Sequence, residues 1–386
     1  MSKGILELRR AADPDPAGSG GKAIRVLMTI DAVGGVWRYA MELAAALRFE
    51  GVAVIFAVVG PPPNTAQTRE AEHFGTLVPF GEILDWMAES ERQLEALPHK
   101  LEQLAKHYSV DVVHLNLPSQ AFGLNLDKPL LVTSHSCPMT WWRAMRTEPL
   151  PPSWHWLQQR IAGGLRHAPI VIAPSRSHAN DLEQEYGPLP NLGVVHNAIA
   201  ASVPGEAKEN FIFAAARWWD ESKNGLLLDR VASAVPWPLV MAGPTTGPNG
   251  QQIDICFARN TGEIPHDQLL DYMRRAAVFV SPSLYEPFGL ATLEAARSKT
   301  ALLLADIPTY RELWDGAAVF FDPRNPDALA SAIGRLTADE QLRRDLAWRA
   351  YMRSRQFVPS RQAKHMARLY RRLMRASSPV PVPIGG

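Results

Sequence analysis

The stretch Ala277-Val-Phe-Val-Ser-Pro-Ser-Leu-Tyr-Glu-Pro-Phe-Gly-Leu-Ala-Thr-Leu-Glu-Ala-Ala296 passes from an apolar strand through a turn into a helix. Pro287 and Gly289 interrupt the chain, and the residues after them have the composition of a helix. Free backbone N–H groups at such a helix start favour an anion, a phosphate in particular. Glu286 lies in the turn, and Glu294 lies about 7–8 Å further along the helix than Gly289. That distance is close to the step from the diphosphate to the ribose of one nucleotide.

The same residues resemble the Glu-x7-Glu signature of glycosyltransferase family 4, whose members are retaining enzymes that use nucleotide sugars. The resemblance lies in Ser-Leu-Tyr-Glu-Pro-Phe-Gly-Leu followed by Glu-Ala. It implies that Glu286 contacts the donor sugar as a catalytic residue and that Glu294 binds the ribose hydroxyls. The backbone of Phe288, Gly289 and Leu290 would hold the donor diphosphate.

Composition permits a globular enzyme of this kind. The 386 residues exceed what one hydrophobic core usually holds, and the apolar share of 46% with 20% charged residues is ordinary. A net charge of +1 argues against a nucleic-acid partner. Cys137 and Cys256 form no CxxC motif, so neither a disulfide framework nor a zinc site is indicated. Without a membrane-spanning run or the apolar core of a signal peptide, the expected compartment is the cytoplasm.

Apolar strand-like runs alternate with helical patterns along most of the chain. The runs span residues 24–29, 52–59, 110–115, 130–134, 170–173, 192–196, 211–215, 239–242, 253–256, 278–280, 301–304 and 319–321. Continuous apolar strands separated by helices predict an α/β fold with parallel sheets that are covered on both faces. A polar stretch near residue 205 divides the runs into two sets. We therefore expect two facing doubly wound, Rossmann-like domains, with ligands beyond the carboxyl ends of the strands.

This arrangement resembles the GT-B architecture, in which two such domains enclose an interdomain cleft. The expected organisation is a disordered leader (1–21), an N-terminal acceptor-side domain (22–204) and a C-terminal nucleotide-sugar-binding domain (205–355). A C-terminal helix (356–376) is expected to pack back on the N-terminal domain, and a disordered tail (377–386) follows.

Two cations follow the first strand run of the second domain. Arg217 and Lys223 lie six residues apart, across a strand end and the start of the next helix, so both can turn toward one anion. Such a pair matches the charge that develops on a departing nucleoside diphosphate. The segment resembles the family's Gly-Arg-Leu and Glu-Lys-Asn/Gly elements, which implies catalytic and donor-binding roles for both cations. It departs from that pattern at Ala216, where the family usually has glycine. It also departs from it in the two bulky residues after Arg217, Trp218 and Trp219.

Two further elements of the first domain resemble family positions. Gly34 and Gly35 follow the first strand run and permit close backbone approach to a ligand. Their position implies donor binding, because the family's Gly-Gly loop lies beside the donor phosphates. His135 ends the fourth run at a position that resembles the family's Thr-x-His histidine, which implies a catalytic place near the reacting sugar. His196 and Asn197 stand where the family has Pro-Asn-Gly, and we interpret them as a hinge.

No metal site is expected. Asp13 and Asp15 match the DxD motif of metal-dependent sugar transferases of another fold, but no strand is predicted next to them. The histidines show no paired ligand spacing such as HxxxH. We expect Arg217, Lys223 and a helix start to stabilise the diphosphate in place of a divalent cation, so no cofactor is expected.

Two surface patterns allow alternative interpretations. Trp141, Trp142, Trp154 and Trp156 cluster after His135, and their rings fit either an acceptor sugar or a packed core. Basic residues greatly outnumber acidic ones between residues 343 and 375, on helices with one apolar side. That segment fits either an anionic membrane surface or a solvated face of the terminal helices.

The resulting prediction is a retaining, metal-independent glycosyltransferase of polysaccharide biosynthesis. Its partners would be a nucleoside-diphosphate sugar donor and a sugar, lipid-linked or small-molecule acceptor, with peripheral membrane association as an open alternative. The alternative functions are a GT-B epimerase or phosphorylase, or a catalytically silent sugar-nucleotide-binding partner protein. Retention is implied by the resemblance alone, because no pair of carboxylates of glycosidase type is visible.

Overall fold

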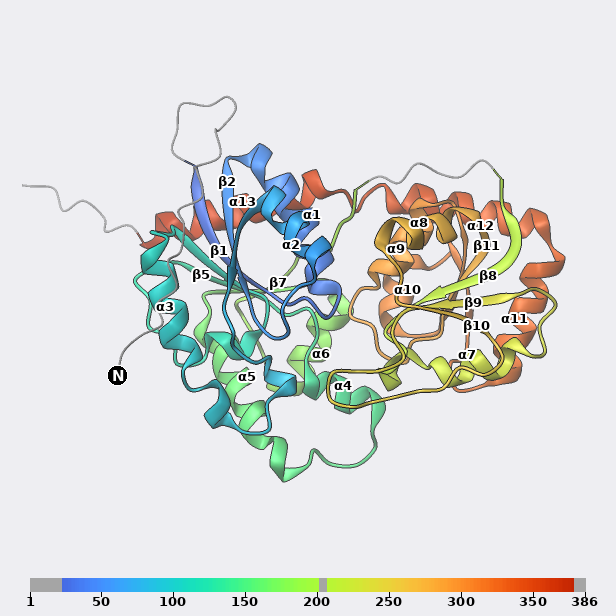
Figure 1. The fold of residues 1–386 in the computed structure, drawn as a ribbon, viewed down its shortest axis with the longest axis horizontal. Coiled ribbons are helices and arrows are strands. Elements are labelled where there is room, and N and C mark those ends of the chain that lie inside the picture. Colours follow the sequence, from blue (N-terminus) through green and yellow to red (C-terminus); the bar gives the residue numbers. More distant parts are fainter. Residues whose placement is uncertain (1–22, 201–206, 378–386) are drawn as a thin grey trace, which may run out of the picture.

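The computed structural model describes residues 23–200 and 207–377. The predicted leader (1–21), the predicted domain boundary at 204–205 and residues 378–386 of the predicted tail lie outside the described residues. Within the described part, two domains lie side by side along the long axis of the molecule (Figure 1). Each contains a parallel sheet with helices packed around it, so the prediction of two doubly wound α/β domains is confirmed.

The first domain is built on a seven-stranded parallel sheet with the order β3-β2-β1-β4-β5-β6-β7. Its strands are β1 (Ile24–Ile30), β2 (Val52–Val58), β3 (Gly75–Pro79), β4 (Val112–Leu115), β5 (Leu130–Thr133), β6 (Ile170–Ala173) and β7 (Leu192–Val194). Its helices are α1 (Gly35–Leu47), α2 (Thr65–Phe74), α3 (Leu97–His107), α4 (Pro138–Met145), α5 (His155–His167) and α6 (Arg176–Tyr186). Short 3₁₀ helices η1 (Arg48–Glu50), η2 (Asp85–Met87), η3 (Glu91–Leu94), η4 (Pro118–Ala121) and η5 (Pro152–Trp154) lie in the connections.

Alternation along β1 explains how both faces of this sheet are buried. Val26 and Met28 pack into a cluster with α1 residues, whereas Leu27 joins a second cluster with residues of α3, α5 and α6. All three side chains are fully buried. The consecutive residues Val26, Leu27 and Met28 are all apolar because each face of the sheet meets helices rather than water.

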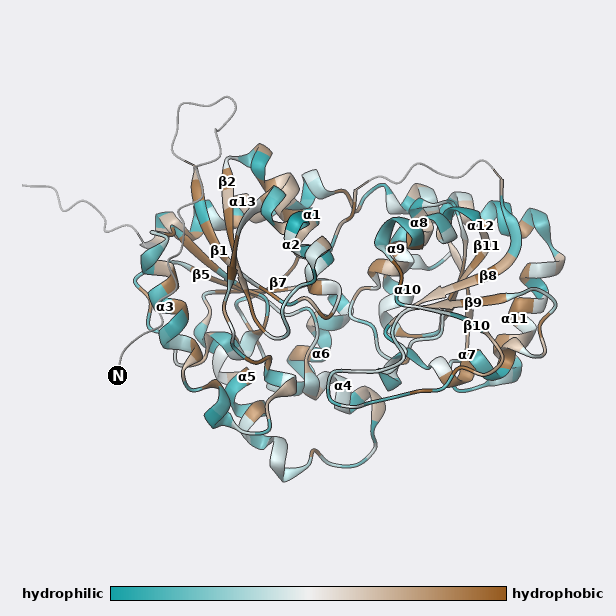
Figure 2. Ribbon diagram, in the orientation of Figure 1, coloured by the Kyte–Doolittle hydropathy of each residue, from teal (hydrophilic) through white to brown (hydrophobic). Residues whose placement is uncertain are grey.

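The second domain is built on a six-stranded parallel sheet with the order β10-β9-β8-β11-β12-β13. Its strands are β8 (Glu209–Ala215), β9 (Leu239–Ala242), β10 (Arg259–Gly262), β11 (Ala276–Ser281), β12 (Ala301–Ala305) and β13 (Ala318–Phe321). Its helices are η6 (Glu221–Lys223), α7 (Gly225–Ala232), α8 (His266–Arg275), α9 (Leu290–Arg297), α10 (Pro308–Trp314), α11 (Pro326–Ala338) and α12 (Glu340–Ser354). The strands are mostly apolar and the outer helix faces polar, as Figure 2 shows.

The prediction of a strand at residues 253–256 is wrong. Residues 253–256 form a loop, and the edge of the sheet is instead the polar strand β10. The loop is held by Asp229 of α7, whose carboxylate accepts backbone N–H bonds of 2.8–2.9 Å from Cys256, Phe257 and Ala258. Ile253 packs against the core from this loop, which explains why the run is apolar without being a strand.

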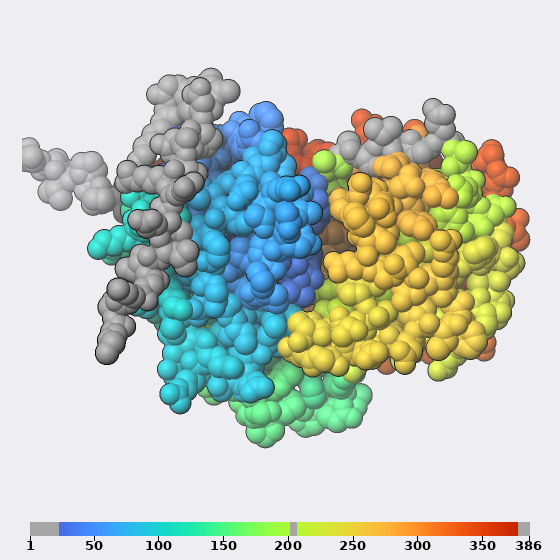
Figure 3. All heavy atoms as spheres, viewed as in Figure 1, coloured from blue at the N-terminus to red at the C-terminus, as the bar shows by residue number. Residues whose placement is uncertain are grey.

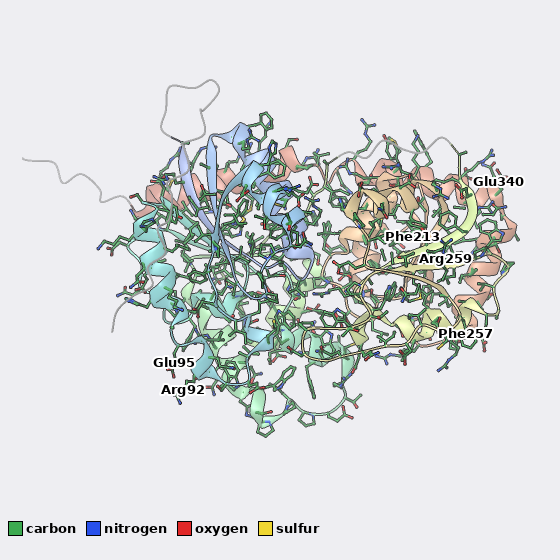
Figure 4. All side chains as sticks on the ribbon, viewed as in Figure 1. Arg92, Glu95, Phe213, Phe257, Arg259 and Glu340 are labelled. Atoms are coloured by element: carbon green, nitrogen blue, oxygen red, sulfur yellow. The ribbon has the colours of Figure 1, made fainter. Side chains whose placement is uncertain are left out.

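Aromatic stacking fills the interior of the second domain. The rings of Phe213 on β8 and Tyr272 on α8 are stacked with centroids 5.2 Å apart and planes 6° apart. Phe213 lies inside the domain beside the sheet, whereas Phe257 lies at its outer edge (Figure 4). Burial of such rings dominates the energetics of a core of this size.

The last helix, α13 (Pro359–Ser377), leaves the second domain and lies against α1 of the first (Figure 1). Met366, Ala367 and Tyr370 are buried in the first domain's core. The hydroxyl of Tyr370 is 2.8 Å from Nδ1 of His114 on β4. The apolar side of α13 is thus occupied by protein, and its basic residues face outward. Among the described residues, no helix combines the length and apolar character needed to cross a membrane.

A half-buried lysine joins several elements of the second domain and yields a stability prediction. Nζ of Lys208 donates to the carbonyls of Met273, Arg274 and Ser298 and to Oγ1 of Thr300, at 2.8–3.3 Å. Burial lowers the pKa of Lys208 to about 7. Lys208→Met removes the donor and leaves carbonyls at two helix ends unsatisfied. We expect the free energy of unfolding to fall by about 2–3 kcal/mol.

Urea unfolding measures this change. Lys364→Met on the exposed side of α13 is the control, and its effect should stay within about 0.5 kcal/mol. A Lys208 variant as stable as the control variant would show that the four contacts do not stabilise the domain.

Candidate functional site

The candidate site is formed where loops after the strands of the two sheets meet. Ser175, after β6, donates through Oγ to the carbonyl of Pro287, after β11, at 2.6 Å. The hydroxyl of Tyr285 lies 2.7 Å from Oγ1 of Thr140 on α4. Figure 3 shows the seam between the domains, with a narrow recess between the blue and orange surfaces. The carboxyl ends of both sheets therefore face one another, as expected for ligand sites of doubly wound sheets.

The first glutamate of the motif is paired with a predicted cation. Oε2 of Glu286 lies 2.7 Å from Nζ of Lys223, and their side chains are 19% and 12% exposed. Lys223 ends η6, and Asn224 follows it in the left-handed conformation with φ of 56°. The Asn224 amide donates to the carbonyls of Pro282 and Pro323, which fixes this corner beside the β11 turn. The pair is therefore preorganised before any ligand arrives.

The second cation faces the first domain's glycine loop. NH2 of Arg217 lies 3.6 Å from Oδ2 of Asp220, and its guanidinium lies 5.2 Å from the ring centre of Trp219. A Cβ on Gly34 would lie 2.8 Å from NH1 of Arg217, so a side chain there would displace the guanidinium. Asp31 shapes the glycine loop by accepting bonds from the N–H groups of Val33 and Gly34 at 3.0 and 3.1 Å. Burial raises the pKa of Asp31, although these hydrogen bonds and the charge of Arg217 act to lower it.

The helix after the motif starts at the seam. Gly289 caps α9 with φ of +87°, and a Cβ there would lie 3.0 Å from Cε1 of Tyr310. Glycine is therefore required both by the left-handed backbone and by the tyrosine ring. Leu290, the first residue of α9, lies near the second glycine of the first domain's loop, because a Cβ on Gly35 would be 3.6 Å from Leu290 Cδ1. The first N–H groups of α9 lack partners within the helix and can bind an anion.

The second glutamate of the motif is buried on α9, the helix that starts at the seam. Glu294 is 5% exposed, and its Oε1 lies 2.8 Å from Nε2 of His266, the first residue of α8. The hydrogen bond to Glu294 is the main cause that raises the pKa of His266. His266 was not predicted from the sequence, because it lies 28 residues from its partner and in no motif.

His135 follows β5, at the carboxyl end of the first sheet. Its Nε2 lies 2.9 Å from Oδ1 of Asn116, whose amide donates to the carbonyl of Thr29 at 2.6 Å. This donation orients the Asn116 oxygen toward the histidine, so Nε2 of His135 carries the proton and Nδ1 is the acceptor. Burial is the main cause that lowers the pKa of His135 to about 3, and His114 and His178 add to it. The imidazole is therefore neutral at physiological pH.

The predicted site residues thus fall on both walls of one seam. Gly34, Gly35 and His135 come from the first domain. Arg217, Lys223, Glu286, Phe288, Gly289, Leu290 and Glu294 come from the second. Within residues 23–200 and 207–377, no group of three or more His, Cys, Asp or Glu side chains is placed to hold a metal ion.

Comparison with known proteins identifies the family. A model described as Glycosyltransferase Family 4 matches residues 33–203, and one described as Glycosyl transferases group 1 matches residues 257–353. Together they match more than two thirds of the chain. The chain is a glycosyltransferase of the family 4 type.

Curated relatives of this glycosyltransferase include polysaccharide-forming enzymes. The glycogen synthase of Mycobacterium tuberculosis is 24% identical over 348 residues, which cover 80% of this chain and 83% of the relative. The O-antigen chain mannosyltransferase B of Escherichia coli is 28% identical over 123 residues, only 32% of this chain and 30% of the relative. The assignment to transferases, and not to a partner protein without activity, rests on these matches and on the family models.

Solved structures show that the glycosyltransferase has the GT-B fold. A sucrose-phosphate synthase from Thermosynechococcus elongatus superposes with a TM-score of 0.75 at 18% identity, over 92% of this chain and all of that one. HepE from Anabaena, solved with UDP and glucose, superposes with a TM-score of 0.68 at 15% identity, over 90% of this chain and all of that one. The predicted architecture is confirmed.

The tryptophans of the predicted cluster lie in two different environments. Trp154 and Trp156 pack against the core of the first domain, as the packing interpretation predicts. Trp141 instead faces the second domain, where its indole N–H donates to Oδ1 of Asp220 at 3.3 Å. The guanidinium of Arg146 lies 5.2 Å from the ring centre of Trp141 and bonds to Glu221 across the seam at 2.6 Å.

Proposed function

We propose that this glycosyltransferase is a retaining, metal-independent enzyme that moves a sugar from a nucleoside diphosphate to a carbohydrate, lipid-linked or small-molecule acceptor. The observation that carries the proposal is the Lys223–Glu286 pair beside the start of α9, with Arg217 across from the glycine loop. Two fixed cations and a helix start are a complete set of partners for a diphosphate. The UDP-bound structures of HepE support a nucleotide sugar as the donor class.

Each predicted residue then has a distinct task. Arg217 and Lys223 would neutralise the leaving diphosphate, and the first N–H groups of α9 would bind its oxygens. Glu294, one helical turn further on, would accept hydrogen bonds from the ribose hydroxyls. Glu286 would face the transferring sugar, opposite the neutral imidazole of His135. Retention of the anomeric configuration is proposed from the family resemblance.

A donor panel tests the proposed function. The enzyme is incubated with UDP-, GDP- and ADP-sugars, and nucleoside diphosphate release is followed with and without EDTA. One donor class should turn over, EDTA should leave the rate near normal, and the anomer released from that donor should retain its configuration. Release that requires inorganic phosphate would indicate a phosphorylase instead. An inverted first product, or complete loss of turnover in EDTA, contradicts the corresponding part of the proposal.

A lipid-linked acceptor would bring the enzyme to a membrane surface, and α13 allows that to be tested. Arg368, Arg372 and Arg375 are exposed along one side of α13, and Arg371 beside them donates to the carbonyl of Glu50 at 2.6 Å. Because the apolar side of α13 is buried, docking on lipid would be electrostatic. It predicts co-sedimentation with phosphatidylserine vesicles at low salt that falls steeply toward physiological salt, where charges are screened within about 8–10 Å.

Two triple variants test whether vesicle binding depends on the arginines of α13 or on the positive charge of the C-terminal helices in general. Arg368→Gln with Arg372→Gln and Arg375→Gln should abolish vesicle binding. Arg344→Gln with Arg349→Gln and Arg355→Gln, on exposed positions at and just after α12, should not. No binding of the unaltered enzyme at low salt would leave the arginines of α13 as a solvated face.

A further inference from the structure

A chain of four polar side chains crosses from the first domain to the second beside the candidate donor site. Glu70 on α2 accepts a bond from NH2 of Arg38 on α1. NH1 of Arg38 lies 3.3 Å from Nδ1 of His266 on α8, and Nε2 of His266 lies 2.8 Å from Oε1 of Glu294 on α9. In Figure 1, α1 and α2 lie on the side of the first domain that faces α8 and α9.

The protons in this chain follow from the chemistry of arginine. A guanidinium can only donate hydrogen bonds, so Nδ1 of His266 must be the acceptor. The ring proton of the neutral imidazole is then on Nε2, where it is donated to Glu294. Arg38 therefore fixes the tautomer that holds the Glu294 carboxylate, as second partners of functional histidines commonly do.

We propose that His266 is a positioning residue that orients the Glu294 carboxylate toward the donor ribose and, through Arg38, links donor binding to the contact between the domains. This inference rests on the proposed function, because it takes the ribose role of Glu294 from there. Glu294 is 5% exposed, and the hydrogen bond from His266 to its Oε1 restricts the orientation of the carboxylate. A carboxylate with a fixed orientation loses less rotamer freedom when the ribose binds.

Protonation of His266 should weaken the link between the domains but not its bond to Glu294. The charged groups that face the ring are Glu294 on α9, Arg38 and Glu42 on α1, and Glu70 on α2. The hydrogen bond to Glu294 raises the pKa of His266, and it persists when the domains separate because both residues belong to the second domain. The charge of Arg38 lowers the pKa of His266, so contact with Arg38 favours the neutral ring. The Arg38 contact is therefore present above the pKa of His266 and is lost as the pH falls through it.

Calorimetric binding of UDP, GDP and ADP, with the tightest of the three used throughout, tests the positioning role. His266→Ala should weaken that binding about tenfold, the value of one hydrogen bond to a charged group, while kcat with the matching nucleotide sugar changes less than about threefold. His266→Gln, which can still donate to Glu294, should recover most of the affinity. In a Glu294→Gln background, His266→Ala should change affinity by less than about twofold, because the two residues act through one contact.

Two further variants test the link and the specificity of the effect. Lowering the pH from 7.5 to 6 should weaken nucleoside diphosphate binding in the unaltered enzyme and have a smaller effect in Arg38→Met. His99→Ala is the matched control, since His99 also pairs with a glutamate, Glu102 at 3.8 Å, but on the exposed face of α3. Binding by the unaltered enzyme together with unchanged affinity in His266→Ala, or an equal loss in both Glu294 backgrounds, would overturn the inference. Failure of the unaltered enzyme to bind any of the three would instead refute the proposed function.

Discussion

Glu286→Gln is expected to lower kcat by about 100-fold or more, because it removes a preorganised charge from the face of the transferring sugar. The substitution keeps the shape of the side chain and leaves Lys223, 2.7 Å from the carboxylate, available to the diphosphate. Affinity for free nucleoside diphosphate should therefore stay nearly unchanged. Steady-state kinetics and calorimetric titration of the same protein measure both quantities.

The other glutamate of the motif provides the comparison. Glu294→Gln should raise the donor KM with a modest fall in kcat, since the ribose does not change during the reaction. Glu209→Gln is the control, because Glu209 is ion-paired at 2.6 Å to Arg275 at the opposite end of β8 from the site. If Glu286→Gln loses nucleoside diphosphate binding and Glu294→Gln keeps it, the two roles are reversed.

Replacing Lys223 or Arg217 with alanine should cost about 2–4 kcal/mol of transition-state stabilisation, as for other preorganised charge partners. This corresponds to a loss of roughly 30- to 1000-fold in kcat/KM. Lys223→Ala also leaves the largely buried Glu286 without its cation. Arg217→Ala opens the space beside Gly34 and removes the guanidinium that lies over Trp219.

The comparison for these variants is Arg275→Ala, an ion-paired surface arginine of the same domain, which should retain activity. All assays are run with EDTA. Activity that survives in Lys223→Ala but disappears on chelation would show that a metal ion, and not the lysine, stabilises the leaving group.

Most of the strands could be predicted from the sequence because both faces of each sheet are buried. Runs such as 211–215 and 301–304 are apolar at every position, and the structure places β8 and β12 there. The strands that were missed or misplaced lie at sheet edges. β3 is half exposed, and β10 is the polar sequence Arg-Asn-Thr-Gly, so neither carries a burial pattern.

The site was predictable only where a short local motif carried it. Glu286, Gly289 and Glu294 lie within nine residues of sequence, and the strand–turn–helix around them fixes their spacing. His266 and Asn116 reach the site through tertiary packing, 28 residues from Glu294 and 19 from His135. No periodicity or spacing in the sequence indicates such a pairing, because other elements lie between the two residues of each pair.

We propose that the seam binds a nucleoside diphosphate through Glu294, Arg217 and Lys223. Calorimetric titration of UDP, GDP and ADP into the enzyme in the presence of EDTA, beside Glu294→Gln and Lys223→Ala, tests this binding most directly. At 100 times its dissociation constant such a ligand would add about 2.7 kcal/mol to the free energy of unfolding, so thermal shifts provide a second readout. One of the three nucleoside diphosphates should bind the unaltered enzyme, and both variants should bind it more weakly. Binding of none of the three, or equal binding by the unaltered enzyme and both variants, would contradict the proposal.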